Sequence, residues 1–442
     1  MASILEHGLT GPTTSSILDD EIRLEALRPV QRRTLVALAA TQVLGLAGLA
    51  AGGTVGGLIG RDLLGGTTWA GLPQASLVVG TAATAVPLSR YMARAGRRPG
   101  LRLGWLLGAA GASLVVAAVI WRSPALLLAG MILVGCASAA GDAAKYAAAD
   151  LARPAARGAA IGAVVAASTV SAVVGPNLTG PTAGLAQILG MPDLAGPFVL
   201  AIVAFGLAAL VLTLFLRPDP LLVAGRLAHP AAHTHAPGAT PRTPLSALLR
   251  RPGVSLGLGA MSVANFVMIL VMTMAPIHIA AHDDSLNVIG LAVSAHIAGM
   301  FALSPLTGRL CDQLGRAPVI GLGGCWLVAA GALAATAAPH DTVVLILSLV
   351  LLGVGWNFGL IGGSTLLTDA VPEIDRPRIQ GIADASAGIA GMVGSVASGL
   401  LLAAAGFAAL GLVAVVVAAG LAGVSLRWVT KPSPMRAPGD LG

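Results

Sequence analysis

The stretch that decides the fold occurs twice, as Gly308-Arg-Leu-Cys-Asp-Gln-Leu-Gly-Arg316 and, in shorter form, as Arg94-Ala-Gly-Arg-Arg98. The Gly-Arg step at residue 96 precedes that at residue 315 by 219 residues (315 − 96). The same offset relates Asp150 to Asp369, Arg157 to Arg376, and Gly162, Gly175 and Gly180 to Gly381, Gly394 and Gly399. One offset that joins loops and apolar segments predicts two copies of a single unit.

The composition around these loops is that of a membrane protein. Of the 442 residues, 56% are hydrophobic and only 10% are charged. Uncharged runs of about 20 residues recur, which is the length of helix that crosses the hydrocarbon core. These runs do not alternate with period two, so helices are expected rather than a β-barrel. The 58 glycines agree, because small residues allow close packing of membrane helices.

We predict an all-α membrane protein with twelve transmembrane helices in two parallel six-helix repeats. The expected segments are a tail (1–33), a first bundle (34–216), a linker (217–252), a second bundle (253–427) and a second tail (428–442). The predicted spans are 34–58, 68–89, 103–121, 125–149, 158–179, 195–216, 253–280, 286–308, 318–338, 342–368, 379–404 and 406–427. Parallel repeats place a substrate site near the membrane midplane, between the halves.

The distribution of arginines predicts the orientation in the membrane. Five arginines lie between the second and third predicted spans and five more in the central linker, whereas the opposite loops hold only Arg61 and Arg122. This positive-inside bias predicts an inner-membrane protein with both termini in the cytoplasm. The net charge of +7 therefore needs no nucleic-acid partner. The linker, with His229, His233 and His235, is expected to be a disordered tether, the alternative being a metal buffer.

Soft side chains gather in the seventh and eighth predicted spans. Met261, Asn265, Met268 and Met272 share one helical face, and His296 and Met300 lie four residues apart. Thioethers and imidazole suit copper(I) better than hard cations. A methionine stripe at helical spacing also serves as packing. An imidazole inside the membrane needs a partner, and polar groups there usually face the bundle interior.

Both quoted loops resemble the G-x-x-x-D-R-x-G-R-R signature of the major facilitator superfamily. The resemblance implies the two-half transporter fold and a cytoplasmic gate at these loops, in which the acidic residue braces a neighbouring helix end. The second copy keeps that acid as Asp312, whereas the first has Ala93 in its place. The gate residues carried over are Gly96, Arg97, Asp312, Gly315 and Arg316.

The paired motifs of spans seven and eight, 268/272 and 296/300, look like those of the CcoA-like copper importers, a bacterial branch of that superfamily. The stretch 296–305 and the stretch 355–372 in span ten look like the same branch. The resemblance implies a copper site of Met268, Met272, His296 and Met300. The branch also includes riboflavin transporters, so copper and riboflavin both remain expected cargoes.

The charged residues inside predicted spans include three candidates for function, namely Asp142, Lys145 and Asp384. Asp142 and Lys145 are spaced to pair on one helix face, and each of the three is a candidate for a proton relay or a gate bridge. The alternative is anchoring at the membrane interface. Trp356 and Asn357 are candidates for the substrate pathway.

Three functions remain open on these residues: copper uptake through the Met/His site, carriage of an organic solute (riboflavin import or drug efflux), and a non-transporting sensor. No phosphate-binding loop and no nucleophile–base pair is present, which predicts a secondary transporter rather than an enzyme. We expect no cofactor, copper being the substrate if it is bound. The expected partners are the lipid bilayer and a small substrate, and the expected state is a monomer.

Overall fold

The computed structural model describes residues 27–64, 69, 71–228, 243–280, 286–338 and 341–430, and within these ranges all regular secondary structure is helical. The first half comprises α2 (Arg28–Leu64), α3 (Leu72–Ala95), α4 (Arg97–Trp121), α5 (Pro124–Ala149), α6 (Arg157–Asn177), α7 (Thr179–Ile188) and α8 (Gly196–Phe215). The second half comprises α11 (Pro252–Met272), α12 (Ala275–Ala280), α13 (Leu286–Phe301), α14 (Ser304–Leu314), α15 (Arg316–Thr336), α16 (Thr342–Ala370) and α17 (Arg376–Thr430).

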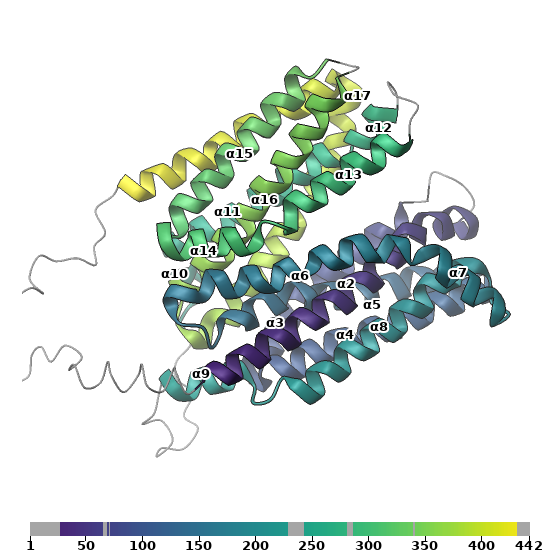
Figure 1. Cartoon of the computed structure of the whole chain (residues 1–442), viewed down its shortest axis with the longest axis horizontal. Coiled ribbons are helices and arrows are strands. Elements are labelled where there is room, and N and C mark those ends of the chain that lie inside the picture. The colour runs from purple at the N-terminus through teal and green to yellow at the C-terminus, as the bar shows by residue number, and fades with distance from the viewer. Residues whose placement is uncertain are drawn as a thin grey trace, which may run out of the picture.

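Each half is a bundle with its own apolar core. In the first half α4 packs on α5, and α2 packs on α6 and α8. In the second half α15 packs on α16 and α17, and α11 packs on α16 and α17. Figure 1 shows the purple-to-teal bundle of the first half beside the green-to-yellow bundle of the second. The equivalent packing in both bundles is the structural counterpart of the sequence repeat.

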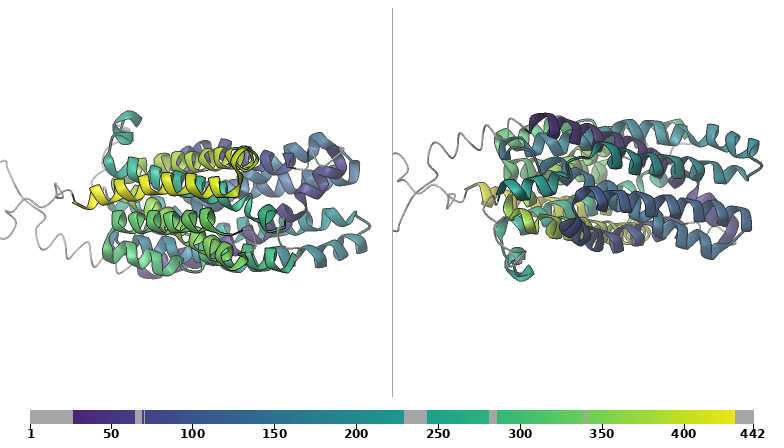
Figure 2. Two further views of the ribbon diagram at one scale, coloured as in Figure 1. Left: turned by 90° about the horizontal axis from the view of Figure 1, so that it is seen from above. Right: turned by 90° about the horizontal axis from the view of Figure 1, so that it is seen from below.

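The start of α2, the end of α17 and the two linker helices, α9 (Pro220–Ala228) and α10 (Leu245–Leu249), lie at one end of the molecule (Figures 1 and 2). We call this the linker end. Gly96 and Gly315 separate consecutive helices there, with φ of 98° and 93°. Such a backbone favours glycine, so both turns at this end require the Gly-Arg step of the repeat.

The two halves touch along their linker-end portions. α3 packs on α17, and α6 packs on α14. At the second contact the approach is as close as backbones allow, because a Cβ at Gly308 would clash with the backbone of Gly158. Further along the bundle, Gly180 and Gly399 have no neighbouring atom within 4 Å of a Cβ position. The halves are therefore joined at the linker end and not along their whole length.

The predicted fold class is confirmed. Ten described helices are long and apolar enough to cross a membrane. One of them, α17, holds two of the predicted spans, divided at Gly406, where φ is 76°. The remaining predicted span is α3, which contains Ser89, Arg90 and Arg94 and is less apolar.

Three expectations about continuity need correction. The predicted span 286–308 is broken between α13 and α14, where Pro305 occupies the first turn of α14 and cannot donate a backbone hydrogen bond. The predicted span 253–280 is broken between α11 and α12. The linker contains helices α9 and α10 and so is not a tether throughout, while its three histidines lie outside the described residues.

Candidate functional site

A buried ion pair joins the two halves. Lys145 of α5 places its Nζ 2.8 Å from Oδ1 of Asp384 on α17, and the two side chains are 5% and 11% exposed. The same ammonium donates to the backbone carbonyl of Asp142 at 2.8 Å. The expected side-chain pair between Asp142 and Lys145 is therefore replaced by a bridge to the other half. Intramembrane charges of this kind are costly, and they mark functional sites by default.

Tyr146 and Met261 extend this cluster. The Tyr146 hydroxyl donates to Asp384 Oδ1 at 3.0 Å and also lies 3.7 Å from the sulfur of Met261. Ser364 of α16 brings a second hydroxyl to the same sulfur, again at 3.7 Å. Met261, predicted on the pathway, thus lies beside the charge cluster, with its thioether accepting from Ser364 and in contact with the Tyr146 hydroxyl.

Asp142 is exposed although it lies one turn from Lys145 on the same helix. Because α5 packs on α2, α3, α4 and α6 and also touches α16 and α17, its exposed face borders the space between the halves. The cluster thus contains two carboxylates and a single ammonium. With two carboxylates present, one of them can bind a proton or a polar solute while the other remains available to pair with Lys145.

A second polar group links α11, α16 and α17. The Asn265 side chain donates to the carbonyl of Ala387 at 2.8 Å and accepts from Trp356 Nε1 at 3.1 Å. The Trp356 ring meets Phe301 edge to face, with centroids 5.7 Å apart. All three of these side chains are half-buried. They form an amide and aromatic wall in the second half.

The second copy of the repeat forms a set of charged contacts between the two halves at the linker end, which we call a latch. Asp369 receives Arg316 Nε at 2.8 Å from its own half and Arg157 Nη1 at 2.6 Å from the first half. Asp312 accepts the backbone amides of Gly158 and Ala159 at 3.0 and 2.8 Å. These amides are among the unpaired donors at the start of α6, so Asp312 caps a helix of the opposite half.

The first copy forms its latch without the acidic residue. Arg97 is fully buried, binds Asp150 with Nε at 2.8 Å, and donates from Nη2 to Gln380 of the second half at 2.6 Å. The helix start that an acid at Ala93 would cap carries Pro377, which has no amide hydrogen. The acidic acceptor and one of the two amide donors are therefore both missing, and Gln380 supplies the contact between the halves.

The residues of the predicted copper site are located on two helices that both pack on α16. Met268 and Met300 are buried and Met272 is half-buried, within one apolar cluster of the second half. His296 is fully buried and its Nδ1 lies 2.7 Å from the carbonyl oxygen of Leu349. Its Nε2 is buried without a hydrogen-bond partner. Among the described residues, no three His, Cys, Asp or Glu side chains assemble as metal ligands.

Asn357 braces the break between α13 and α14. Its side-chain amide donates to the carbonyl of Met300 at 2.6 Å and to the Ser304 hydroxyl at 2.7 Å, and its oxygen accepts from Thr307 at 2.6 Å. It is fully buried. In this conformation the interrupted helix uses the amide of Asn357, whereas Trp356 beside it is half-buried.

Sequence reasoning missed several partners in these networks. Tyr146 and Gln380 were not singled out, and Asp150, Asp369 and Arg157 served only as markers of the repeat. The repeat itself held the signal for the last three, since charged residues matched at a 219-residue offset fall at the same loops. Nothing local to Tyr146 or Gln380 distinguishes either from a packing residue.

Two helical halves, joined by ion pairs at the linker end and by a buried charge cluster, are the architecture of a polytopic membrane transporter. The family model of the Major Facilitator Superfamily matches residues 37–285 and 256–440. The chain belongs to this superfamily. A solved structure of the superfamily transporter FucP in the outward conformation has a TM-score of 0.70 at 14% identity, covering 90% of this chain and 99% of that one.

Relatives with closer sequences were also found. An uncharacterized MFS-type transporter of Bacillus subtilis (strain 168), YdeG, is 37% identical over 395 residues, covering 88% of this chain and 90% of the relative. The riboflavin transporter RfnT of Brucella anthropi is 30% identical over 355 residues, covering 80% of this chain and 85% of the relative.

Proposed function

We propose that this chain is a secondary transporter that carries a small organic solute through a site between its two halves. The observation that carries the proposal is the Lys145–Asp384 pair, together with Tyr146 and the exposed Asp142 beside it. Opposite charges and a hydroxyl from both halves can each contact a polar solute. Solute binding would then act on the contacts that hold the halves together.

The energetic logic of transport is a shift between two conformations. Opening the linker end requires separation of Asp369 from Arg157, of Arg97 from Gln380 and of Asp384 from Lys145. A solute or proton that satisfies Asp384 lowers the cost of the last separation. A ligand shifts such an equilibrium only by its differential affinity for the two states, and this cluster provides that difference.

Riboflavin is the first solute to test. The relative RfnT is named as a riboflavin transporter, and Trp356, Phe301 and Asn265 offer aromatic faces and an amide for a planar polar molecule. The aromatic content of the chain is only 3%, which by itself argues against a stacking pocket. Trp356 and Phe301 nevertheless place two rings in contact beside the Asn265 amide.

We further propose that the linker end faces the cytoplasm in a bacterial inner membrane. Support comes from the arginines at this end, among them Arg90 and Arg94 in the last turns of α3 and Arg153 between α5 and α6. A reporter that is active only in the cytoplasm should be active when it is fused after residue 442. Activity of a periplasmic reporter at that position would reverse the orientation.

Copper remains a second candidate because of His296. Its Nε2 is buried and unpartnered, which is unusual for an imidazole inside a bundle, and Met268, Met272 and Met300 lie in the same half. Soft thioether and imidazole donors fit copper(I). This proposal needs Met268, Met272 or Met300 to approach His296 in some conformation.

Paired uptake assays separate the two cargoes. Cells that lack their own uptake systems, with and without the chain, are supplied with radioactive riboflavin or radioactive copper. We expect riboflavin accumulation that Lys145→Met abolishes and His296→Ala preserves in substantial part. Copper accumulation lost in both His296→Ala and Met268→Ala, without riboflavin uptake, would replace the organic solute by copper.

A further inference from the structure

The first turns of α2 carry three exposed arginines. Arg28, Arg32 and Arg33 precede the apolar stretch that begins near residue 34, so they lie where the helix enters the membrane interface. Arg33 is held in place, because its Nη2 donates to the carbonyl of Leu214 at 3.3 Å and its guanidinium lies 5.8 Å from the ring centre of Phe215. Cations at this depth meet the phosphate groups of the lipids.

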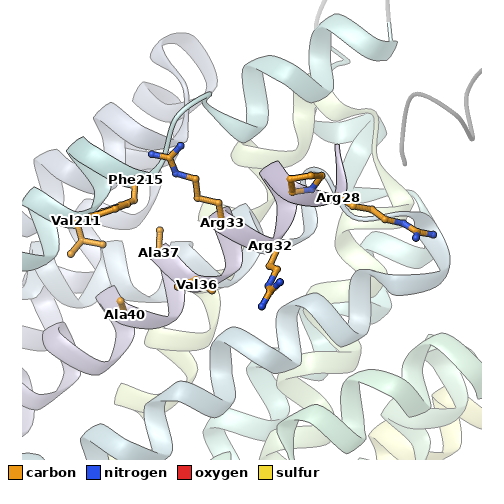
Figure 3. Close-up of a pocket in the computed structure, with 9 residues that line it drawn as sticks. Arg28, Arg32, Arg33, Val36, Ala37, Ala40, Val211 and Phe215 are labelled. Atoms are coloured by element: carbon orange, nitrogen blue, oxygen red, sulfur yellow. The ribbon is translucent and has the colours of Figure 1, made fainter. Parts of the chain in front are cut away.

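A hollow of about 680 Å³ lies beside these arginines, between α2 and α8. Figure 3 shows Arg33 reaching toward the side of Phe215 and Val211, and Arg32 projecting from the other flank of α2. Below the arginines the lining is apolar and open to the outside, with Val36 63% and Phe215 49% exposed. The hollow therefore has a cationic rim and an apolar wall, which is the profile of a phospholipid.

A second hollow of about 420 Å³ flanks α2 on its other side and shares Arg28 and Arg32. Arg153 lines it as well, above the apolar side chains of Leu35 and Leu151. The cationic rim thus continues around the start of α2. Both hollows are lined by residues of the first half alone, so they are separate from the site between the halves.

Two arginines of this rim, Arg32 and Arg33, are exposed and can bind an anion. Among the described residues, no carboxylate pairs with Arg32 or Arg33. Guanidinium groups bind phosphate in a fork geometry, and basic pockets between membrane helices on the cytoplasmic side hold anionic headgroups.

We propose that the start of α2 binds an anionic phospholipid of the surrounding leaflet. Arg33 holds the headgroup phosphate, Arg32 adds a second positive charge at the rim, and an acyl chain lies along Val36 and Phe215. A soluble phosphate compound would leave this apolar wall exposed, so the lipid is the better occupant. The chain's own acidic run, Asp19, Asp20, Glu21 and Glu25, is the competing occupant that the test must exclude.

Native mass spectrometry of the purified full-length chain, titrated with phosphatidylglycerol, phosphatidylcholine or glycerol 3-phosphate, tests the proposal. We expect phosphatidylglycerol to bind in preference to the other two. The Arg32→Gln/Arg33→Gln variant should lose roughly 30-fold in affinity, at about 5-fold for each arginine. Val36→Asn should weaken the lipid and leave glycerol 3-phosphate unchanged.

The matched control is Arg90→Gln/Arg94→Gln, which removes two exposed arginines of α3 at the same end that line neither hollow. It should bind phosphatidylglycerol like the natural chain. Equal losses in both double variants would overturn the proposal, as would equal binding of phosphatidylcholine or of glycerol 3-phosphate. Binding that appears only after neutralisation of residues 19–25 would assign the rim to the acidic run instead.

Discussion

Nζ of Lys145 and Oδ1 of Asp384 lie 2.8 Å apart, and they belong to different halves of the chain. The pair is buried among helices, where neither water nor salt screens it. The pair is a direct contact between the two halves, and it is the polar site at which we propose that the solute binds.

The pair predicts an unequal response to single and double substitution. Lys145→Met alone leaves Asp384 buried beside Tyr146 without a cation, which should cost about 3–5 kcal/mol of stability, whereas Lys145→Met/Asp384→Leu should be much less destabilised. Both variants should be inactive in uptake, because the polar site is lost. Thermal unfolding in detergent, measured beside uptake, checks both statements.

An exposed pair provides the control. Arg122 and Asp62 lie 3.2 Å apart with side chains 66% and 51% exposed. Exposed pairs contribute little, so Arg122→Gln should change neither stability nor uptake appreciably. If Arg122→Gln reduced stability and uptake as much as Lys145→Met does, burial would not explain the effect of the Lys145–Asp384 pair.

Asp312→Asn should slow transport while solute affinity stays near its natural value. The substitution removes the charge and one of the two oxygens that cap α6, which is worth about 1–2 kcal/mol. The ratio of closed to open linker ends should then fall by roughly 5- to 30-fold. Spin-label distances across the linker end measure this ratio directly.

Asp219→Asn is the matched control for Asp312→Asn. Asp219 also accepts backbone amides, including that of Arg98 at 2.7 Å, but within the first half and the linker. Its loss should leave the spin-label distances unchanged. Reduced solute binding in Asp312→Asn with unaltered distances would contradict the latch.

Gly308→Ala should favour the state that is open at the linker end. The new Cβ would lie 2.7 Å from the backbone carbon of Gly158 and 3.0 Å from Cα of Ala159, and backbone atoms cannot give way cheaply. Gly399→Ala, whose Cβ meets no atom within 4 Å, should behave as the natural chain. Cysteine labelling at the linker end should rise only in the first variant, and equal labelling would count against close packing as the seal.

Trp356→Phe should raise KM for the solute several-fold with a smaller effect on kcat. It removes the hydrogen bond to Asn265, worth about 1 kcal/mol, and keeps an aromatic ring against Phe301. Trp326→Phe, which alters a tryptophan that is 40% exposed on α15, serves as the control. Identical kinetics in the two variants would remove Trp356 from the substrate wall.

The membrane class, the repeat and most spans follow from local sequence, because run length and offset are read along the chain. The Lys145–Asp384 pair does not, since its members are 239 residues apart and each is compatible with interfacial anchoring. The break in the eighth span also escaped detection. Pro305 signals it, but Pro87 lies inside the continuous helix α3, so proline alone does not decide.

The first latch shows the limit of motif comparison. Ala93 departs from the loop signature, and Arg97 is nevertheless fully buried and bound to both Asp150 and Gln380. Pro377 removes one of the two amide donors that the missing acid would have bound. The two missing groups lie in different halves, so the relation between them is found only when the contact between the halves is known. The copper site stays a prediction, since it depends on a conformation in which methionine sulfur approaches His296.

The central claim is that the two halves alternate around the Lys145–Asp384 cluster to move an organic solute. Counterflow in proteoliposomes tests it most directly: vesicles loaded with unlabelled riboflavin are exposed to labelled riboflavin outside. We expect labelled riboflavin to accumulate transiently above equilibrium with the natural chain and not with Lys145→Met. Absence of counterflow for riboflavin and for a panel of planar polar solutes, while copper enters the same vesicles, would contradict the account.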